Sequence, residues 1–440
     1  MLTWRTKLQL WKNNEVIITD AINISRGIFQ GDTLSPLLFC IGYFMVSQKL
    51  KMLRIGYVPG IPGKRDPSNM RSHFVFMDDF KGMTTNEASL GTLMKTCIEI
   101  LKELGLEVGL NKCAVMKVKR GKVENMEGLK LDNDHVINNI DEGLGYAYLG
   151  ILQILDPCHN QIKKTLLSKV ENCANEIWKS NLTEQNKVKA HNMFVISKLN
   201  YSFGVIKWTK FELDEIDRKM RKIIAKYTCM NLHSNTDRLY LNRKKGGKGL
   251  LNIHHMHNRT LCSLVTYIFN AKSEHAKLIK EFWISKSDGT LLKIADVIIF
   301  NANINVSFTR TGTIYESSLI DSNKFSKLLN TTYEKQYQHS WLSSSLHRKI
   351  LKSCIDSGAD VQSSFQWLMS SNLRGEAASS IFAIQEQMIA TRVICKRIWK
   401  EDIISEKCRV CDQSIESISL IVSSCTPLAD KQYKDRHDNI

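Results

Sequence analysis

Apolar residues recur at helical spacing along much of the chain. One such stripe covers residues 90–104 and is followed by Gly105, which predicts a helix that ends there. Two further stripes, over residues 162–177 and 213–227, predict long helices in the middle of the chain. We interpret a polar stretch at 307–323 as a candidate boundary within the helix-rich residues that follow. The chain is therefore expected to be mainly helical from Asn160 onward.

Shorter apolar clusters, typical of strands, dominate the first 155 residues. Residues 72–83 are rich in Phe and Val, and Asp78 and Asp79 interrupt them, which predicts two short strands joined by a tight turn that carries both aspartates. A helix end followed by a strand is expected within residues 1–25, a loop and strand at 106–116, and an aromatic strand at 146–151. This order predicts an α+β unit, a sheet with helices packed on one face.

A helix is expected to begin at Ser35, a residue type that caps helices well, with Pro36 in the first helical position. Its spacing predicts that one face enters the core, through Leu37, Leu38, Ile41, Phe44 and Met45.

The loop before this helix has the composition of a ligand-binding loop. Gly27 and Gly31 would let the backbone approach a ligand closely, while Gln30 offers an amide and Arg26 a charge. The alternative is that the glycines serve only the turn that caps the helix.

Charge is the unusual part of the composition. The 440 residues suffice for two to four compact units, and their formal net charge of +17 favours a polyanionic partner, either nucleic acid or an anionic membrane surface. No apolar run reaches the ~20 residues that span a bilayer. Because the first residues also lack the apolar core of a secretory signal, we expect an intracellular protein of the nucleus or cytoplasm, without a membrane partner. The sequence identifies no protein partner.

Adjacent aspartates at a turn are unfavourable unless a cation neutralises them. Magnesium binds carboxylate oxygens together with the phosphate oxygens of a substrate, so Asp78 and Asp79 are candidates for metal-assisted nucleotidyl transfer. The alternative is an ordinary solvated turn.

Two further groups carry candidate chemistry. Residues 238–250 concentrate cations among glycines, which is typical either of a solvated face or of a groove that follows a phosphate backbone. On the second interpretation, nucleic-acid contacts are predicted for Arg238, Arg243, Lys244, Lys245 and Lys248. Near the end of the chain, Cys408 and Cys411 form a Cys-x-x-Cys pair with Cys425 downstream, which indicates zinc, a metal that needs four N or S donors.

Several of these segments resemble, in consistent order, the reverse transcriptases of non-LTR retrotransposons. Residues 26–36 are similar to the family's template-contacting loop, Phe76-Met77-Asp78-Asp79 to its metal-binding hairpin, and the loop ending in Lys112 to the one near the incoming triphosphate. Tyr148-Leu149-Gly150 resembles the primer grip, and residues 376–392 resemble the linker ahead of a zinc knuckle.

The resemblance implies an RNA-directed DNA polymerase that uses an RNA template, a DNA primer, deoxynucleoside triphosphates and Mg²⁺. It implies a partial right-hand fold: fingers and palm at 1–155, a helical thumb at 156–260, a helical linker at 261–400 and a knuckle-like tail at 401–440. Asp78 and Asp79 would bind metal, Lys112 would lie beside the leaving group, and Arg26, Gly27, Gln30 and Gly31 would contact template or nucleotide.

The chain also departs from the family pattern. The family's first catalytic aspartate lies on a strand upstream of Trp4, so we expect a truncated enzyme that is inactive on its own. Leu420 stands near the place of the knuckle's histidine, which leaves His437 as a poorly spaced substitute. Two alternatives are a retained nucleic-acid-binding protein without catalysis and a remnant that does not fold stably.

Overall fold

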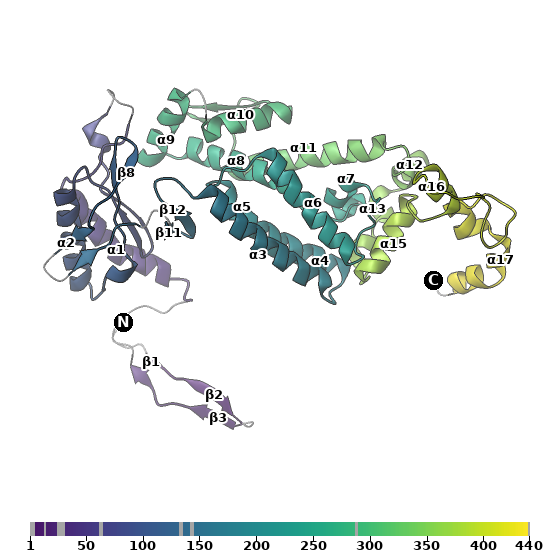
Figure 1. The fold of residues 1–440 in the computed structure, drawn as a ribbon, viewed down its shortest axis with the longest axis horizontal. Helices are drawn as coiled ribbons and strands as arrows, with labels where there is room; N and C mark the ends of the chain where they lie inside the picture. The colour runs from purple at the N-terminus through teal and green to yellow at the C-terminus, as the bar shows by residue number, and fades with distance from the viewer. Residues whose placement is uncertain are drawn as a thin grey trace. The chain divides into compact units, whose positions relative to one another are not determined.

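The computed structural model describes residues 5–12, 15–23, 31–60, 65–131, 135–140, 145–286 and 289–438. They belong to two compact units, Met1–Cys158 and His159–Ile440 (Figure 1). The prediction of a helix-rich α+β protein is confirmed at this level, since the second unit is mainly helical and the first combines two long helices with short antiparallel strands. None of the helices among the described residues combines the length and apolar character needed to cross a bilayer.

The first unit contains two long helices and a set of short strands. The helices are α1 (Ser35–Met52) and α2 (Glu87–Glu103), and 3₁₀ turns form at η1 (Pro67–Asn69) and η2 (Leu110–Lys112). The strands are β1 (Arg5–Thr6), β2 (Gln9–Lys12), β3 (Glu15–Ile18), β4 (Ile22–Asn23), β5 (His73–Phe76), β6 (Asp79–Gly82), β7 (Lys117–Lys119), β8 (Lys122–Glu124), β9 (Leu129–Lys130), β10 (Val136–Ile137), β11 (Tyr146–Tyr148) and β12 (Ile151–Gln153).

These strands do not form the single sheet that the sequence predicts. Among the described residues of this unit, every named strand belongs to a two-stranded antiparallel pair, β1 with β4, β2 with β3, β5 with β6, β7 with β8, β9 with β10 and β11 with β12. Each strand has only two to four residues and pairs with one other strand. The helix end expected within residues 1–25 is also wrong, because the described residues there form strands β1 to β4.

The core of the first unit lies between its two helices. Tyr43, Val46 and Leu50 of α1 pack with Leu93, Cys97, Ile100 and Leu101 of α2, and Val75 and Phe80 of the β5–β6 hairpin pack against them. As predicted, α2 ends before Gly105, which adopts a positive φ of 74°.

The start of α1 and its buried face differ from the prediction. Its N-cap is Leu34, whose backbone N–H donates to the Asp32 carboxylate at 2.9 Å, and Ser35 is already helical. The five side chains expected in the core are all at least 36% exposed. Because α1 is apolar around most of its circumference, the sequence pattern alone does not identify the face that meets α2.

The second unit is a helical assembly, and the helices predicted over 162–177 and 213–227 form as α3 (His159–Lys179) and α6 (Lys210–Lys226). Its other helices are α4 (Glu184–Ala190), η3 (His191–Ile196), α5 (Ser197–Phe203), α7 (Thr236–Tyr240), η4 (Arg243–Lys245), α8 (Ile253–Asn270), α9 (Glu274–Ser285), α10 (Leu291–Asn301), α11 (Ser322–Ser343), α12 (Lys349–Asp356), α13 (Val361–Ser364), α14 (Trp367–Ser370), α15 (Gly375–Gln385), α16 (Arg392–Arg397), η5 (Leu420–Ser424), α17 (Thr426–Leu428), η6 (Ala429–Tyr433) and α18 (Lys434–Asp438).

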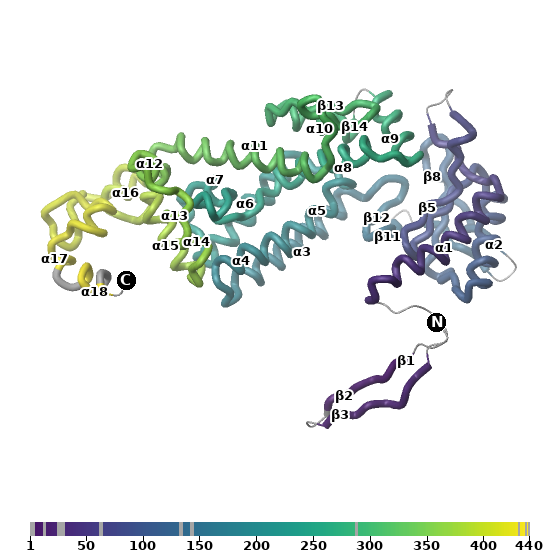
Figure 2. Tube along the Cα trace, turned by 180° about the vertical axis from the view of Figure 1, so that it is seen from behind, coloured from purple at the N-terminus to yellow at the C-terminus, as the bar shows by residue number. Residues whose placement is uncertain are grey.

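The polar stretch at 307–323 contains a small sheet that the sequence did not reveal. Strands β13 (Val306–Thr309), β14 (Gly312–Tyr315) and β15 (Ser318–Leu319) form it, and β13 and β14 lie beside α10 (Figure 2). Phe308 and Tyr315 pack on the buried cluster that contains Phe269 of α8 and Phe325 of α11. The sheet is therefore part of the core of this unit.

Candidate metal and nucleic-acid sites

The paired aspartates occupy the tip of a hairpin, as predicted. Strands β5 and β6 pair antiparallel with Phe76 opposite Asp79, so Met77 and Asp78 form the turn and Asp79 begins the second strand. Met77 takes a positive φ of 53°, a conformation that costs of order 1–3 kcal/mol when a residue other than glycine adopts it and that persists only where neighbouring contacts fix it. Both carboxylates are exposed.

Contacts with α1 hold this hairpin in place. The His73 ring at the start of β5 bonds to the Ser47 hydroxyl of α1 at 3.0 Å through Nε2 and to the Ser72 hydroxyl at 2.7 Å through Nδ1. The Cys40 thiol lies 3.9 Å from the Met77 sulfur at the turn. The carboxylates therefore stand on a supported tip rather than on a free loop.

Two further predicted segments are near the hairpin. The Tyr146 hydroxyl donates to the Lys112 carbonyl at 2.9 Å, and the Lys81 ammonium of β6 lies 5.1 Å from the centre of the Tyr148 ring. Burial and then the charge of Asp79 raise the pKa of Tyr148. The structure thus brings Asp79, Lys112 and Tyr148 into one neighbourhood, although nothing in it tests the roles predicted for them.

The expected aromatic strand at 146–151 is a hairpin instead. Tyr148 pairs with Ile151 across a two-residue turn of Leu149 and Gly150, which have positive φ values of 49° and 72°. Positive φ at both central positions is the geometry of the tight turns that match strand twist. The segment predicted as primer grip is therefore a turn with Tyr148 at its base.

The acid pair fits a divalent cation only in part. Two exposed carboxylates on adjacent residues supply hard oxygen ligands of the kind that Mg²⁺ binds together with substrate phosphates. Within the described ranges, however, no third Asp, Glu, His or Cys completes a cluster of three such ligands around the pair.

Of the predicted glycine loop, Arg26, Gly27 and Gln30 lie outside the described residues. Gly31 is described and has a φ of 97°, in the region that favours glycine. Apart from its chain neighbours, no atom of the described residues lies within 4 Å of the place where a Cβ would be. A ligand contact at Gly31 stays a prediction.

The prediction of nucleic-acid contacts at 238–250 is wrong for Arg238 and Lys248. The Arg238 side chain is fully buried, pairs with Glu386 at 3.2 Å, and lies over the rings of Trp341 and Phe382. The Lys248 side chain is 1% exposed, and its ammonium lies 3.6 Å from the Glu184 carboxylate. Both charges serve the packing of the second unit because buried carboxylates and ring faces compensate them.

The rest of this segment is also largely engaged within the protein. Arg243 pairs with Glu184 at 2.6 Å, and Lys245 pairs with Glu334 at 2.7 Å. A Cβ on Gly247 would lie 2.1 Å from the Leu241 carbonyl, so this glycine serves a close backbone approach. Lys244 remains exposed, which leaves it available to a ligand.

Three cysteines come together near the end of the chain. The sulfurs of Cys408, Cys411 and Cys425 lie within 4.8 Å of one another, with Cys408 and Cys425 3.9 Å apart. Tetrahedral Zn²⁺ with bonds of about 2.3 Å holds its sulfurs about 3.8 Å apart, so the spacing fits. Backbone N–H groups of Ser414 and Gln413 lower the pKa of Cys411 to about 7, which favours the thiolate that zinc requires.

The fourth zinc donor is not established. His437 belongs to α18, but its side chain lies outside what the structure describes. Glu416 braces the cysteine loop, since its buried carboxylate accepts hydrogen bonds from the backbone N–H groups of Arg392 and Arg409.

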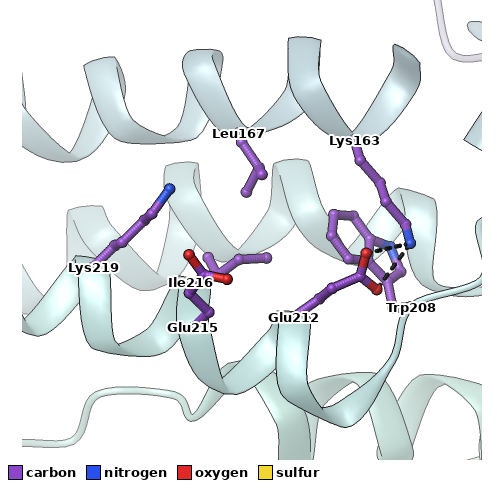
Figure 3. A pocket seen from close by; sticks show the side chains of 7 residues that line it. All are labelled: Lys163, Leu167, Trp208, Glu212, Glu215, Ile216 and Lys219. Carbon is purple, nitrogen blue, oxygen red and sulfur yellow. Dashed lines mark hydrogen bonds and ion pairs between the residues drawn. The ribbon is translucent and has the colours of Figure 1, made fainter. Parts of the chain in front are cut away.

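A small groove between α3 and α6 has a volume of about 180 Å³ (Figure 3). Figure 3 shows Lys163 reaching across it to Glu212, at 2.7 Å, and the Lys163 ammonium lies 5.1 Å from the centre of the Trp208 ring. At the other end, Lys219 pairs with Glu171 at 3.1 Å. These charges neutralise one another, so we assign the groove to the packing of the two helices.

Sequence reasoning missed two residues of the hairpin neighbourhood, Lys81 and Tyr146. Residues two apart on a strand face the same side, so Lys81 could have been associated with Asp79, and Tyr146 with Tyr148.

Comparison with known protein families gives a match within the first unit. Residues 5–151 match the family model described as "Reverse transcriptase (RNA-dependent DNA polymerase)". This stretch contains α1, the acidic hairpin, Lys112 and the Tyr148 turn. No curated protein matches the chain.

Proposed function

We propose that the first unit is part of the polymerase core of a reverse transcriptase from a non-LTR retrotransposon, with Asp78 and Asp79 as ligands of catalytic Mg²⁺. The observation that carries the proposal is the supported Asp78–Asp79 tip within the stretch that matches the reverse transcriptase family. Its substrates would be an RNA template, a DNA primer and deoxynucleoside triphosphates.

The proposed chemistry divides the work between metal and protein. Bound Mg²⁺ would activate the primer 3′ hydroxyl and stabilise the triphosphate and its leaving group. Asp78 and Asp79 would bind the metal cations at the tip of the hairpin. Lys112 would offset negative charge on the leaving group, and Tyr148 with the Leu149–Gly150 turn would position the primer.

We further propose that this chain does not polymerise by itself. Two carboxylates at the tip are too few ligands for a two-metal site. Together with the net charge of +17, this shortage favours a second candidate function, nucleic-acid binding without catalysis. The proposal includes a zinc ion held by Cys408, Cys411 and Cys425, which metal analysis of the purified chain and of Cys411→Ser tests.

Primer extension on an RNA template with Mg²⁺ tests the catalytic part. We expect background product from the chain and from Asp78→Asn alike, together with salt-sensitive binding of the primer–template. Robust synthesis that Asp78→Asn abolishes would show that the two aspartates suffice and would contradict the proposed incompleteness. Absence of any nucleic-acid binding would contradict the family assignment itself.

A further inference from the structure

One face of the second unit combines exposed rings with lysines. Between Glu184 and Glu212 the sequence has no Asp or Glu. It has five lysines there, Lys187, Lys189, Lys198, Lys207 and Lys210. Apart from Lys187, which is buried, these lysines are exposed. A run of this length with only positive charge complements a polyanion and repels other cations.

The helical segment formed by α4, η3 and α5 places part of this run on one surface. Phe194, Lys198 and Tyr201 follow one another at intervals of four and three residues, which puts a lysine between two rings on the same face. Lys189 and Met193 continue the face toward α4, four residues apart. Met193, Phe194 and Tyr201 are 63%, 52% and 60% exposed. We call these five residues the lysine–aromatic face.

The opposite side of the same segment is firmly packed. Val195, Ile196 and Leu199 are buried, His191 accepts a hydrogen bond from the Trp178 indole of α3 at 3.2 Å, and the Phe203 ring meets His257 of α8 edge-on. The buried side thus carries the packing of this segment on α3 and α8.

The face is also fixed in orientation by the segment that sequence analysis had assigned to nucleic acid. The Asn192 amide donates to the Gly249 carbonyl at 2.8 Å and accepts from the Leu251 N–H at 3.1 Å. These bonds anchor η3, a π-helical segment of the kind often found at functional sites. The backbone at Gly249 and Leu251 therefore supports the helix whose outer side carries the exposed lysines.

We propose that the lysine–aromatic face binds single-stranded nucleic acid. Phe194 and Tyr201 lie about 10 Å apart along the helix, enough to stack on separate bases, while Lys189 and Lys198 meet the phosphates. Exposed rings favour a single strand, because its bases are free to stack, over a duplex whose bases already stack on each other. The proposal rests on the function proposed above in one respect, namely that the polyanion is a nucleic acid.

Binding of a fluorescein-labelled oligouridylate of about 16 nucleotides, measured by anisotropy with the full chain, tests the proposal. For the double variant Phe194→Ala and Tyr201→Ala we expect Kd to rise about tenfold or more with the salt dependence unchanged. For Lys189→Gln with Lys198→Gln, the slope of log affinity against log salt should become shallower by about 1.4, or ~0.7 for each lost contact. Tyr201→Phe keeps the ring and should bind like the unmodified chain.

Matched controls come from other exposed residues of the second unit. Phe282→Ala with Phe300→Ala removes two exposed rings, and Lys324→Gln with Lys327→Gln removes two exposed lysines; both controls should leave Kd and the salt slope unchanged. Variants of the face that bind like these controls would overturn the proposal, whether or not the face then proves to bind a protein. The assay needs neither a metal ion nor a deoxynucleoside triphosphate. A negative result would therefore contradict the lysine–aromatic face without contradicting the assignment of Asp78 and Asp79 as metal ligands.

Discussion

The acidic tip of the first unit and the basic segment of the second make opposite use of their charge. Asp78 and Asp79 are exposed, and among the described residues neither has an ion-pair partner. Arg238 and Lys248 are buried, and Glu386 and Glu184 neutralise them. In the sequence both segments look like charge gathered for a ligand. A dense charge run is therefore a candidate for ligand binding only where the protein itself leaves the charge uncompensated.

Replacement of Arg238 should give the largest effect on stability. Arg238→Ala leaves the Glu386 carboxylate buried without its cation, and breaking such a pair costs roughly 3–5 kcal/mol of unfolding free energy. Urea unfolding followed by tryptophan fluorescence measures this, because Trp178 and Trp341 are buried in the second unit. Lys244→Ala, an exposed change in the same segment, should stay within about 0.5 kcal/mol.

The double variant Arg238→Leu with Glu386→Leu sharpens this test, since removal of both charges is expected to recover part of the loss. If Arg238→Ala instead left stability unchanged and weakened nucleic-acid binding, the segment would be a contact surface after all.

Acidification should give the next largest loss of stability, because His191 is buried. Burial lowers the pKa of His191 to about 4, below the usual value of about 6.5, so the unfolded chain takes up the proton first as pH falls. Stability is then lost progressively below about pH 6.5, and by pH 5 the loss is about 2 kcal/mol from this residue, at 1.36 kcal/mol per pH unit.

Urea unfolding of His191→Gln at pH 7 and pH 5 measures this contribution. The variant should lose less stability on acidification than the unmodified chain, whereas His339→Gln, at an exposed position, should behave like the unmodified chain. An equal loss in His191→Gln would mean that the buried ring does not control the acid sensitivity.

The exposed aspartates should matter least for stability. Asp78→Asn with Asp79→Asn removes two adjacent like charges from a solvated tip, and surface changes of this kind usually stay within about 0.5 kcal/mol. A loss of several kcal/mol in urea unfolding would show that the carboxylates hold the fold together, contrary to a role in binding.

The elements with one clear period were predictable from the sequence. The helices α2, α3 and α6 and the acidic hairpin follow from residue spacing, a closing glycine and a pair of turn residues. The sequence did not predict which side of α1 is buried, because an apolar helix gives no periodic contrast. It also could not show that Glu184 and Glu386, 59 residues or more from their cationic partners, neutralise the basic segment.

The candidate site was predictable in part for the same reason. Asp78 and Asp79 are neighbours in sequence, so local pattern identifies them. The approach of Lys81 to Tyr148, and of Tyr146 to Lys112, depends on how separate hairpins pack.

Manganese binding at the Asp78–Asp79 tip tests the central claim most directly, because Mn²⁺ replaces Mg²⁺ at oxygen ligands and is visible by electron paramagnetic resonance. In the presence of a deoxynucleoside triphosphate, the chain should bind Mn²⁺ at a site that Asp78→Asn with Asp79→Asn removes. Asp356→Asn with Asp402→Asn, which removes two other exposed carboxylates, should retain that site. Equal Mn²⁺ binding by the two double variants would contradict the account.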